Sequence, residues 1–585
     1  MSGSGGQNLL WADLLVEELS RCGVGLFCVS PGARSAPLAL ALARRKNTLT
    51  VVHFDERATA FAAIGYARAT GRPACWITTS GSAVANGLPA VVEADADGLP
   101  LILLTADRPP ELRNSGANQT IRQPGIFGRF VRWEVDLSVP TTAIAPAFVL
   151  STVDEAVSHA VNFDPGPVHV NVMFREPLLP NEPTARFAGT SLPSRWLDSE
   201  KPFTQKDAAF GQPTWPRDLV DPISASTRGV IISGRMNAFD DHAAVERLAE
   251  HLGWPLLPDI GSQLRLGAPS PSTVAYYDQA LGSQTFRARI RPDVVLQFGG
   301  RPTSKRLAQA LAEWQPEHYV VTHPRPARLD PDHIASHQFN SSIGSTADAL
   351  RDALPTSSSD VLPIWKRAAE TVEHSVESRL VSEKGLTEPA VARAITRLIP
   401  SGHSLFAASS MPIRDLDMFA STEGQRVAIT SNRGASGIDG TIATAAGFSL
   451  GTGQPTTVLM GDLAFLYDLN ALAMLRSPNG IRLTIVVLNN DGGGIFNMLP
   501  LAEHQEAFER FIATPHGIGF EYAASMFGLA YSRPESIDEF AVAYSRATAS
   551  SDSMIIEVRS DRVENAELHR ELLHLCSEAV QKILE

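Results

Sequence analysis

The chain has few cysteines and no long apolar run, and these two absences exclude whole classes of protein. Its 585 residues include four cysteines, too few for a disulfide-stapled scaffold, and no CxxC pair or other spacing that suits zinc. No apolar run approaches the roughly 20 residues of a membrane span, and the first residues, MSGSGGQ, lack the features of a secretory signal. We therefore expect a soluble cytoplasmic protein without a membrane span. The cysteines, expected as free thiols, are Cys22, Cys28, Cys75 and Cys576.

Positive charge is also in short supply. Lysine and arginine total 50 against 63 aspartate and glutamate residues, which gives a formal net charge of −13. This balance argues against a broad basic surface for nucleic acid or acidic lipid, so we predict no nucleic-acid partner. The sequence also has no repeat of 20–50 residues, which argues against a solenoid or a propeller. Small-molecule chemistry is the class that the composition favours.

Short apolar, β-branched runs alternate with helix-like segments along most of the chain. This alternation is typical of parallel sheets that are buried on both faces. We predict an α/β fold of three consecutive domains, each with a mostly parallel sheet covered by helices on both faces. The runs are VGLFCVS (24–30), LTVVHF (49–54), ACWITTS (74–80), LPLILLTA (99–106), VHVNVM (168–173), GVIISG (229–234), DVVLQFGG (293–300), HYVVTH (318–323), HSLFAAS (403–409), TTVLM (456–460) and LTIVVL (483–488).

Prolines and helix-start residues indicate where the domains end. Between Pro177 and Pro222 the rhythm stops and prolines recur, which indicates a long linker. Thr387, Glu388 and Pro389 suit the start of a helix that opens the third domain. The central domain lacks G-x-G-x-x-G, so a dinucleotide site is not supported there. The predicted segments are a first domain over 8–180, a linker over 181–224, a central Rossmann-like domain over 225–354, a linker or helix over 355–384 and a third domain over 385–585.

The most informative stretch is residues 456–494. Two apolar strands flank a segment of helical period at 467–476, and such a unit makes the two strands parallel neighbours. Asp462 and Asn490 follow those strands, so we expect them at the edge where open α/β sheets bind ligands. A carboxylate, an amide oxygen and a backbone carbonyl in a glycine-rich turn suit Mg²⁺ completed by phosphate oxygens. Taken alone, Gly-Asp after a strand is also a common turn.

The pairing of Gly-Asp with Asn-Asn resembles the cofactor signature of the thiamine-diphosphate enzymes, although Leu463 stands where glycine is usual. The local form GDLAFLYDLNAL is similar to that of one family among them, the menaquinone-pathway synthases that make 2-succinyl-5-enolpyruvyl-6-hydroxy-3-cyclohexene-1-carboxylate (SEPHCHC). The resemblance implies that thiamine diphosphate is the cofactor. It also implies that Asp462, Asn490 and the carbonyl of Gly492 hold Mg²⁺ or Mn²⁺.

An activating carboxylate is expected at Glu56, in VVHFDERATAFAAIGYARATG (51–71). From the residues alone, Asp55 and Glu56 are better explained as acidic residues that favour a helix N-terminus. The motif DER, however, resembles the form found in the same family, which implies that Glu56 hydrogen-bonds N1′ of the cofactor's aminopyrimidine. In this superfamily the glutamate and the metal site meet across a subunit interface. The resemblance therefore also implies a homodimer or a dimer of two dimers.

Several arginines stand at expected loops or strand ends, where a guanidinium group can hold a carboxylate by two hydrogen bonds. Individually, each is explained as well by a solvated surface charge. The runs SPGARSAPL, TADRPPELRNSGANQ and SNRGASGIDG nevertheless resemble the family's motifs, with Ala33 in place of the usual serine. The resemblance implies a catalytic and substrate-binding set of Arg34, Glu56, Arg108, Gln119, Lys305, Arg306, Ser410, Arg414 and Arg433.

The resemblance also implies a set of cofactor contacts. Ile438, which apart from its motif is explained as a core residue, is expected to wedge the cofactor into a V-shape. TSGSAVAN (79–86) begins a helix and is expected to supply backbone N–H groups. The full set is Glu56, Thr79, Ser80, Gly81, Ser410, Met411, Ile438, Gly461, Asp462, Leu463, Asn490, Gly492, Ile495 and Phe496.

By this resemblance the chain is a transferase that joins carbon to carbon. It is expected to decarboxylate 2-oxoglutarate and to add the resulting succinyl-semialdehyde carbanion to isochorismate, giving SEPHCHC and CO₂. One alternative is another thiamine-diphosphate 2-oxoacid decarboxylase or carboligase, such as an acetohydroxyacid synthase. Another is a catalytically silent sensor that binds the cofactor. A silent sensor should lack the activating glutamate or the metal ligands, and the sequence has candidates for both.

Overall fold

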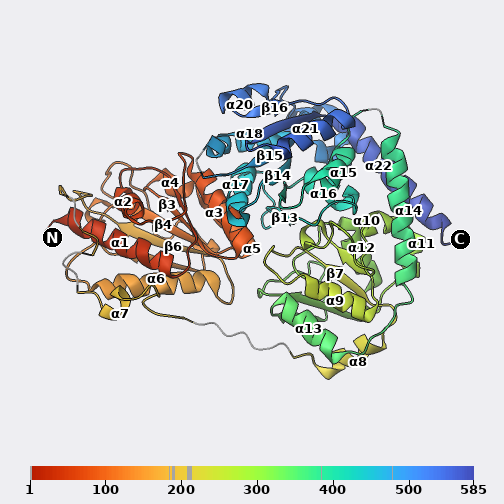
Figure 1. The fold of residues 1–585 in the computed structure, drawn as a ribbon, viewed down its shortest axis with the longest axis horizontal. Helices are drawn as coiled ribbons and strands as arrows, with labels where there is room; N and C mark the ends of the chain where they lie inside the picture. The colour runs from red at the N-terminus through yellow and green to blue at the C-terminus, as the bar shows by residue number, and fades with distance from the viewer. Residues whose placement is uncertain (1–2, 183–184, 188–190, 207–213, 384, 477–478) are drawn as a thin grey trace. The chain divides into compact units, whose positions relative to one another are not determined.

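The computed structural model describes residues 3–182, 185–187, 191–206, 214–383, 385–476 and 479–585 (Figure 1). Two compact units divide the chain, and each is described by itself. Unit 1 is built from residues 1–209, 432–453 and 468–481, and unit 2 from 210–431, 454–467 and 482–585. The three-domain boundaries expected from the sequence stay a prediction. Within the expected linker, residues 183–184, 188–190 and 207–213 lie outside the described residues.

Unit 1 contains a six-stranded sheet in the order β2-β1-β3-β4-β6-β5, and every neighbouring pair is parallel. Helices α1, α2 and α6 pack on one face, and α3 and α5 cover the other. The strands are β1 (Leu26–Val29), β2 (Thr50–Val52), β3 (Ala74–Thr78), β4 (Leu101–Asp107), β5 (Trp133–Leu137) and β6 (Pro167–Met173). The helices are α1 (Ser4–Arg21), α2 (Ala36–Arg44), α3 (Glu56–Thr70), α4 (Ser82–Ala85), α5 (Leu88–Asp97), α6 (Pro146–Val161), α7 (Ser194–Leu197) and α17 (Thr441–Thr452).

Unit 2 contains two more parallel sheets. The first has the order β11-β10-β9-β7-β8, with α8, α9 and α13 on one face and α10, α11, α12 and α14 on the other. Its strands are β7 (Val230–Ser233), β8 (Leu256–Pro258), β9 (Val294–Phe298), β10 (His318–His323) and β11 (His337–Asn340). Its helices are α8 (Arg217–Ala225), α9 (Ala243–Leu252), α10 (Tyr277–Ala280), α11 (Gln284–Arg289), α12 (Lys305–Trp314), α13 (Ile343–Ala353) and α14 (Leu362–Val381).

The second sheet of unit 2 has the order β13-β12-β14-β15-β17-β16 and packs against α15, α16 and α21. Its strands are β12 (Ser404–Ala407), β13 (Ala428–Thr430), β14 (Thr456–Gly461), β15 (Leu483–Asn489), β16 (Ala530–Ser532) and β17 (Met554–Arg559). The accompanying helices are α15 (Glu388–Leu398), α16 (Met411–Phe419), α18 (Asp462–Tyr467), α21 (Ile537–Ala549) and α22 (Arg562–Lys582). The predicted α/β class with parallel sheets is confirmed.

Eleven of the described strands are found where the sequence predicts them, from the three-residue β2 to the seven-residue β15. β14 and β15 are parallel neighbours, as the predicted β-α-β unit requires. Six of the described strands were not predicted. One of them is β5, whose alternating burial leaves it without a continuous apolar run. The helical segment expected over 467–476 is divided differently: α18 ends at Tyr467, and a 3₁₀ helix runs over Leu469–Arg476.

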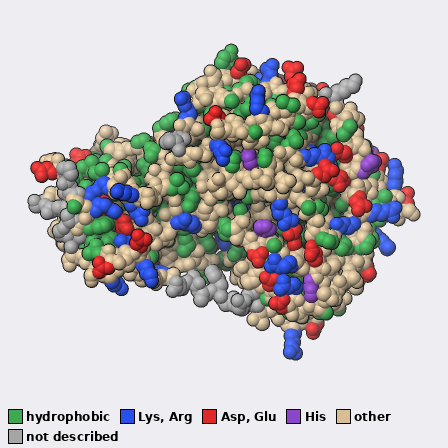
Figure 2. All heavy atoms as spheres, viewed as in Figure 1, with side chains coloured by type: hydrophobic (Ala, Val, Ile, Leu, Met, Phe, Trp, Pro, Cys, Tyr) green, Lys and Arg blue, Asp and Glu red, His purple; other side chains and the backbone are tan. Residues whose placement is uncertain are grey.

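Three further observations concern the surface charge, the length of the helices and the state of the cysteines. On the face drawn in Figure 2, lysine and arginine side chains are interspersed with acidic ones and do not form one basic surface. The described helices include none that is both long and apolar enough to span a bilayer. All four cysteines are free thiols.

Within unit 1, α3 and α17 pack so closely that each needs a glycine at the contact. A Cβ on Gly65 of α3 would lie 2.1 Å from the carbonyl oxygen of Thr444, and one on Gly447 of α17 would lie 1.9 Å from that of Ala62. Real Cβ atoms do not approach a backbone oxygen so closely. This packing fixes α3, whose first residue is Glu56, against the helix that follows the SNRGASGIDG loop.

We predict that Gly447→Ala destabilises unit 1. Alanine normally favours a helix interior by about 0.5–1 kcal/mol over glycine. Here the clash with Ala62 outweighs that gain, because overpacking costs about 1–3 kcal/mol. Denaturant unfolding should therefore show a lower midpoint for Gly447→Ala. The control is Gly385→Ala, whose new Cβ would meet nothing within 4 Å. Equal midpoints for the two variants would contradict the close packing of α3 and α17.

Candidate active site in two halves

Glu56 lies where the sequence expects it, at the junction of β2 and α3. Asp55 caps α3 by accepting a hydrogen bond from the Ala58 N–H at 3.2 Å, so Glu56 is the first helical residue. Its side chain is half-buried, and its Oε2 accepts a hydrogen bond from Asn86 Nδ2 at 3.2 Å. The carboxylate is therefore accessible at the carboxyl edge of the sheet of unit 1.

Two buried arginines lie at the same edge. Arg34 follows β1 and is 6% exposed; it donates to the Phe174 carbonyl at 2.9 Å and to Glu176 Oε1 at 2.8 Å. Arg108 follows β4, is 8% exposed and donates to the hydroxyl of Ser80. Burial, and then repulsion from Arg34, lowers the pKa of Arg108. Two buried like charges at one edge of a sheet favour an anion, and the Glu176 carboxylate already serves as one for Arg34.

The loop after β3 is tied to the loop after β4. Gln119 has a left-handed backbone (φ 57°) and donates from Nε2 to the Ser80 carbonyl at 3.0 Å. The Ser80 hydroxyl donates in return to the Gln119 carbonyl at 3.3 Å. Thr79 and Gly81 flank Ser80 in the same loop. The structure thus brings Thr79, Ser80, Gly81, Arg108 and Gln119 together, and their roles stay a prediction.

The sequence did not indicate a role for Gln123, which hydrogen-bonds to the loop after β3 and to β4. It is fully buried, its Oε1 accepts from the Gly81 N–H at 3.3 Å, and its Nε2 donates to the Ala106 carbonyl at 2.9 Å. The same Nε2 donates to Asn171 Oδ1 at 2.7 Å. No signal in the sequence marks Gln123, because its partners lie in the loop after β3 and on strands β4 and β6.

The SNRGASGIDG loop also belongs to unit 1, and a buried glutamate of α5 holds it. Glu93 accepts from the N–H groups of Gly434 and Ala435 at 3.0 and 2.7 Å, and it pairs with Arg68 at 2.9 Å. Burial, and then the neighbouring Asp97, raises the pKa of Glu93. Within the loop, Arg433 and Ile438 are both half-buried, so Ile438 is not an ordinary core residue.

The predicted metal ligands lie in unit 2, at the carboxyl ends of the adjacent strands β14 and β15. Asp462 is 2% exposed and accepts from the Leu463 and Gly492 N–H groups at 2.6 and 2.9 Å. His516, which sequence reasoning also missed, contacts Asp462 Oδ2 through Nε2 at 3.1 Å. Burial raises the pKa of Asp462 against these stabilising hydrogen bonds. The Asp462 carboxylate and the turn after Asn490 are therefore in direct contact.

The donor set fits a hard divalent cation. Asn490 is 8% exposed, and its Oδ1 is buried without a hydrogen-bond partner among the described residues. A buried amide oxygen without a partner is costly, and a metal ion would satisfy it. Gly492 has φ 132°, and a Cβ there would lie 2.2 Å from the Ala513 carbonyl oxygen, so only glycine fits this turn. A carboxylate, an amide oxygen and a glycine carbonyl thus follow the ends of two adjacent strands, and they are donor types that suit Mg²⁺ or Mn²⁺.

Further predicted cofactor residues surround these strand ends. Ser410 precedes α16 with φ 75°, an unusual conformation for serine, and its carbonyl accepts a hydrogen bond from Arg414. Strained backbone of this kind clusters at functional sites. Met411 is buried, Ile495 is half-buried and Phe496 is 38% exposed. Gly461 ends β14 directly before Asp462 and Leu463.

Two predicted cations begin α12, beside the first sheet of unit 2. Lys305 is exposed, whereas Arg306 forms an ion pair with the buried Asp278. Cations at a helix N-terminus oppose the helix dipole, so their position is unfavourable for the helix itself. The predicted site residues therefore fall into two sets, one in each unit. Their catalytic and binding roles stay predictions.

The fold and this donor set define a thiamine-diphosphate enzyme, and three stretches of the chain match the corresponding families. Residues 11–126 match the family described as the N-terminal TPP binding domain of thiamine pyrophosphate enzymes. Residues 191–407 match the middle domain of thiamine pyrophosphate enzymes, and 415–558 match their C-terminal TPP binding domain.

Comparison with individual proteins narrows the class to one family. A SEPHCHC synthase of Rubrobacter xylanophilus is 52% identical over 569 residues, covering 97% of this chain and 98% of the relative. The synthases of Salinibacter ruber and Pelodictyon phaeoclathratiforme are 45% and 42% identical, covering 98% and 99% of this chain and 97% and 98% of the relatives. The chain belongs to the SEPHCHC synthase family.

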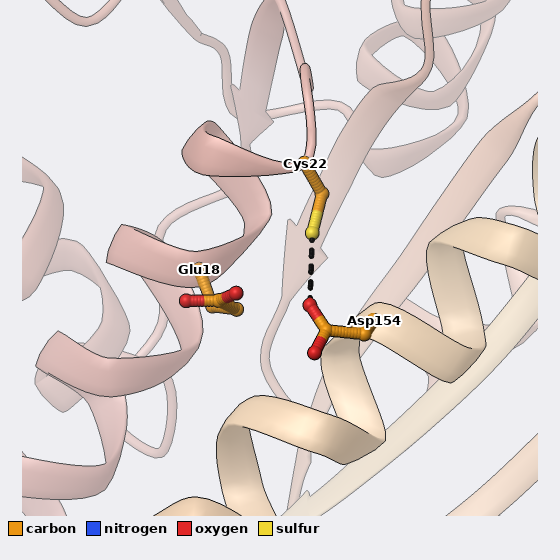
Figure 3. Close-up of side chains that lie close together, drawn as sticks. All are labelled: Glu18, Cys22 and Asp154. Carbon is orange, nitrogen blue, oxygen red and sulfur yellow. Dashed lines mark hydrogen bonds between the residues drawn. The ribbon is translucent and has the colours of Figure 1, made fainter. Parts of the chain in front are cut away.

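A second group of metal-ligating side chains lies elsewhere in unit 1, between α1 and α6 (Figure 3). Glu18, Cys22 and Asp154 place one ligand atom each within 4.8 Å of one another. Unlike Asn490 Oδ1, no oxygen of Glu18 or Asp154 is buried without a partner among the described residues. Glu18 accepts from the Phe203 N–H and from Trp196 Nε1, both at 2.5 Å, and Asp154 accepts from Cys22 Sγ at 3.3 Å. We interpret this group as an anchor for residues 196–203, not as a cation site.

The anchor predicts a pH-dependent stability. Burial, with the nearby Asp154, raises the pKa of Glu18 from 4.5 to about 8, so the folded chain keeps a proton that the unfolded chain has lost. Stability should therefore fall as pH rises between those two values and level off above pH 8, with a slope of at most about 1.4 kcal/mol per pH unit.

Denaturant midpoints measured across this range should show the decline, and Glu18→Gln should flatten it. The control is Glu155→Gln, on α6 beside Asp154, because hydrogen bonding to Lys206 lowers the pKa of Glu155 out of this range. A Glu18→Gln profile that declines as steeply as the wild-type profile would contradict this account of the anchor.

Proposed function

We propose that this chain is a SEPHCHC synthase that joins 2-oxoglutarate, after loss of CO₂, to isochorismate in menaquinone biosynthesis. The observation that carries the proposal is the pair formed by Asp462 and Asn490. It stands at adjacent strand ends with an unsatisfied buried amide oxygen. In a chain of this family, such a pair is suited to the metal ion that holds the diphosphate.

Each half of the site has its own task in this proposal. In unit 2, Asp462, Asn490 and the Gly492 carbonyl hold Mg²⁺ or Mn²⁺, and Ser410, Met411, Ile495 and Phe496 line the cofactor. Thiamine diphosphate, when bound, supplies the electron sink that decarboxylation of a 2-oxoacid needs. In unit 1, Glu56 holds a proton at N1′ of the aminopyrimidine, and Ile438 shapes the cofactor.

The cations give the site its substrate class. Both substrates are dicarboxylates, and carboxylates are held best by guanidinium groups that are pre-positioned and partly dehydrated. Arg34 and Arg108, buried side by side with mutual repulsion, fit this requirement in unit 1. We assign Lys305, Arg306, Arg414 and Arg433 to the remaining substrate carboxylates, and Gln119 to a polar contact.

The active species is proposed to be a homodimer in which Glu56 of one chain serves the metal site of its partner. This arrangement follows from the family resemblance, and it would explain why the predicted residues fall into two sets. A dimer of two such dimers would contain the same site. A cytoplasmic location stays a prediction.

Competition between two donors tests the proposal. Wild-type protein with isochorismate should use 2-oxoglutarate in preference to pyruvate. Single neutral replacements of Arg34, Arg108, Lys305, Arg306, Arg414 or Arg433 should weaken the use of a substrate by about 1.5–3 kcal/mol in kcat/KM, the scale of a charged hydrogen bond. Cofactor binding should survive. The control is Arg175→Gln, an arginine half exposed and paired with Glu111. A preference for pyruvate, or indifference to all six replacements, would point to a different carboligase.

Glu56→Gln should keep the fold and cofactor binding and lose most turnover, because an amide cannot share a proton with N1′. General acid–base catalysis contributes about 10²–10⁴-fold, which sets the expected fall in kcat. Asp55→Asn is the matched control, since asparagine caps a helix as well as aspartate and activity should stay within about threefold. A folded Glu56→Gln protein with undiminished kcat would exclude this role.

A further inference from the structure

A buried carboxylate touches the proposed metal ligand Asn490 from outside the predicted site. Glu388 begins α15, and the sequence explains it only as an acidic residue at a helix start. In the structure it is 1% exposed, and its Oε1 accepts from Asn490 Nδ2 at 2.8 Å. The same oxygen accepts from the Ser560 hydroxyl at 2.9 Å. A helix-start role needs no such contact, because Thr387 already caps α15.

The contact decides which end of the Asn490 side chain points away from Glu388. An asparagine amide has one donating end and one accepting end of nearly equal size, so only its hydrogen-bond partners fix its orientation. The Glu388 oxygen that it meets accepts two hydrogen bonds, and it therefore selects the NH₂ end of Asn490. The accepting end, Oδ1, is left buried and free of any partner among the described residues.

The backbone at Gly494 also restricts the space around the Asn490 side-chain amide. A Cβ on Gly494 would lie 2.6 Å from Asn490 Nδ2 and 3.2 Å from its Oδ1. The side chain is therefore held between Glu388 and the backbone of the glycine-rich turn. With so little room, a rotation that exchanged the two ends would place the NH₂ group where a cation is expected and would repel it.

We propose that Glu388 is a positioning residue for metal binding, and that it holds the Asn490 amide so that Oδ1 faces the ion. The inference rests on the proposed function, because it needs a divalent cation at Asp462 and Asn490. It goes beyond that function by assigning a role to a residue on a different helix. Partners of metal ligands orient them and typically change metal affinity by about 10–100-fold when removed.

Mn²⁺ binding in the presence of thiamine diphosphate, measured by titration calorimetry, tests this role without any turnover. Glu388→Ala should weaken Mn²⁺ binding by about 10–100-fold. Glu388→Asp keeps the charge and shortens the side chain, and it should also weaken Mn²⁺ binding. This second variant serves as the test if Glu388→Ala does not fold. Glu388→Gln keeps one accepting oxygen for the Asn490 NH₂ and should restore most of the affinity. Saturating Mn²⁺ should rescue cofactor binding in Glu388→Ala.

The matched control is Asp417→Ala. Asp417 is also buried and accepts a hydrogen bond from the Ile260 N–H at 2.8 Å, and its charged neighbours are Asp259, Asp278 and Arg265. This variant should lower the melting temperature without changing Mn²⁺ affinity. Wild-type affinity in both Glu388→Ala and Glu388→Asp, or an equal loss in Asp417→Ala, would overturn the positioning role. Wild-type protein that binds the cofactor without Mn²⁺ or Mg²⁺ would instead overturn the proposed metal site itself.

Discussion

Parallel pairing of the strands is the constraint on which every part of the candidate site depends. In a parallel sheet all carboxyl ends reach the same edge, so residues far apart in the sequence meet there without any direct link. β14 and β15 bring Asp462 and Asn490 together in this way, and β1 and β4 bring Arg34 and Arg108. The apolar strands provide the stability, and the loops after them are free to carry charge.

Those loops carry strained or buried polar backbone that needs support, and buried acidic side chains supply it. Glu93 holds the N–H groups of the loop that contains Arg433, and Glu388 holds the side chain of Asn490. A buried carboxylate is costly unless its hydrogen bonds are satisfied, and in Glu388 only Oε1 has partners among the described residues. Each of these glutamates therefore ties the stability of a helix to the shape of a functional loop. Removing one should change the site as well as the fold.

The sequence predicts features that depend on residues close together in the chain. It does not predict contacts between residues that are far apart in the chain. Apolar runs such as LTIVVL mark buried strands because a parallel sheet is apolar on both faces. Asp462 and Asn490 are predictable because they follow such runs directly. Strand β5 has no comparable signal, since one of its faces is exposed. Glu388 and Gln123 act through partners 102 and 42 residues away, so their roles appear only when the chain is folded.

In the proposed function, Glu56 and Asp462 belong to two different sets of residues. Glu56 of one chain and Asp462 of its partner chain then form one active site. Mixing Glu56→Gln protein with Asp462→Ala protein, and measuring SEPHCHC formation after subunit exchange, tests this most directly. Each variant alone should be nearly inactive. In a two-fold dimer each mixed pair regains one intact site, so random exchange should restore about a quarter of wild-type activity. Proven exchange without any regained activity would contradict a site shared between chains.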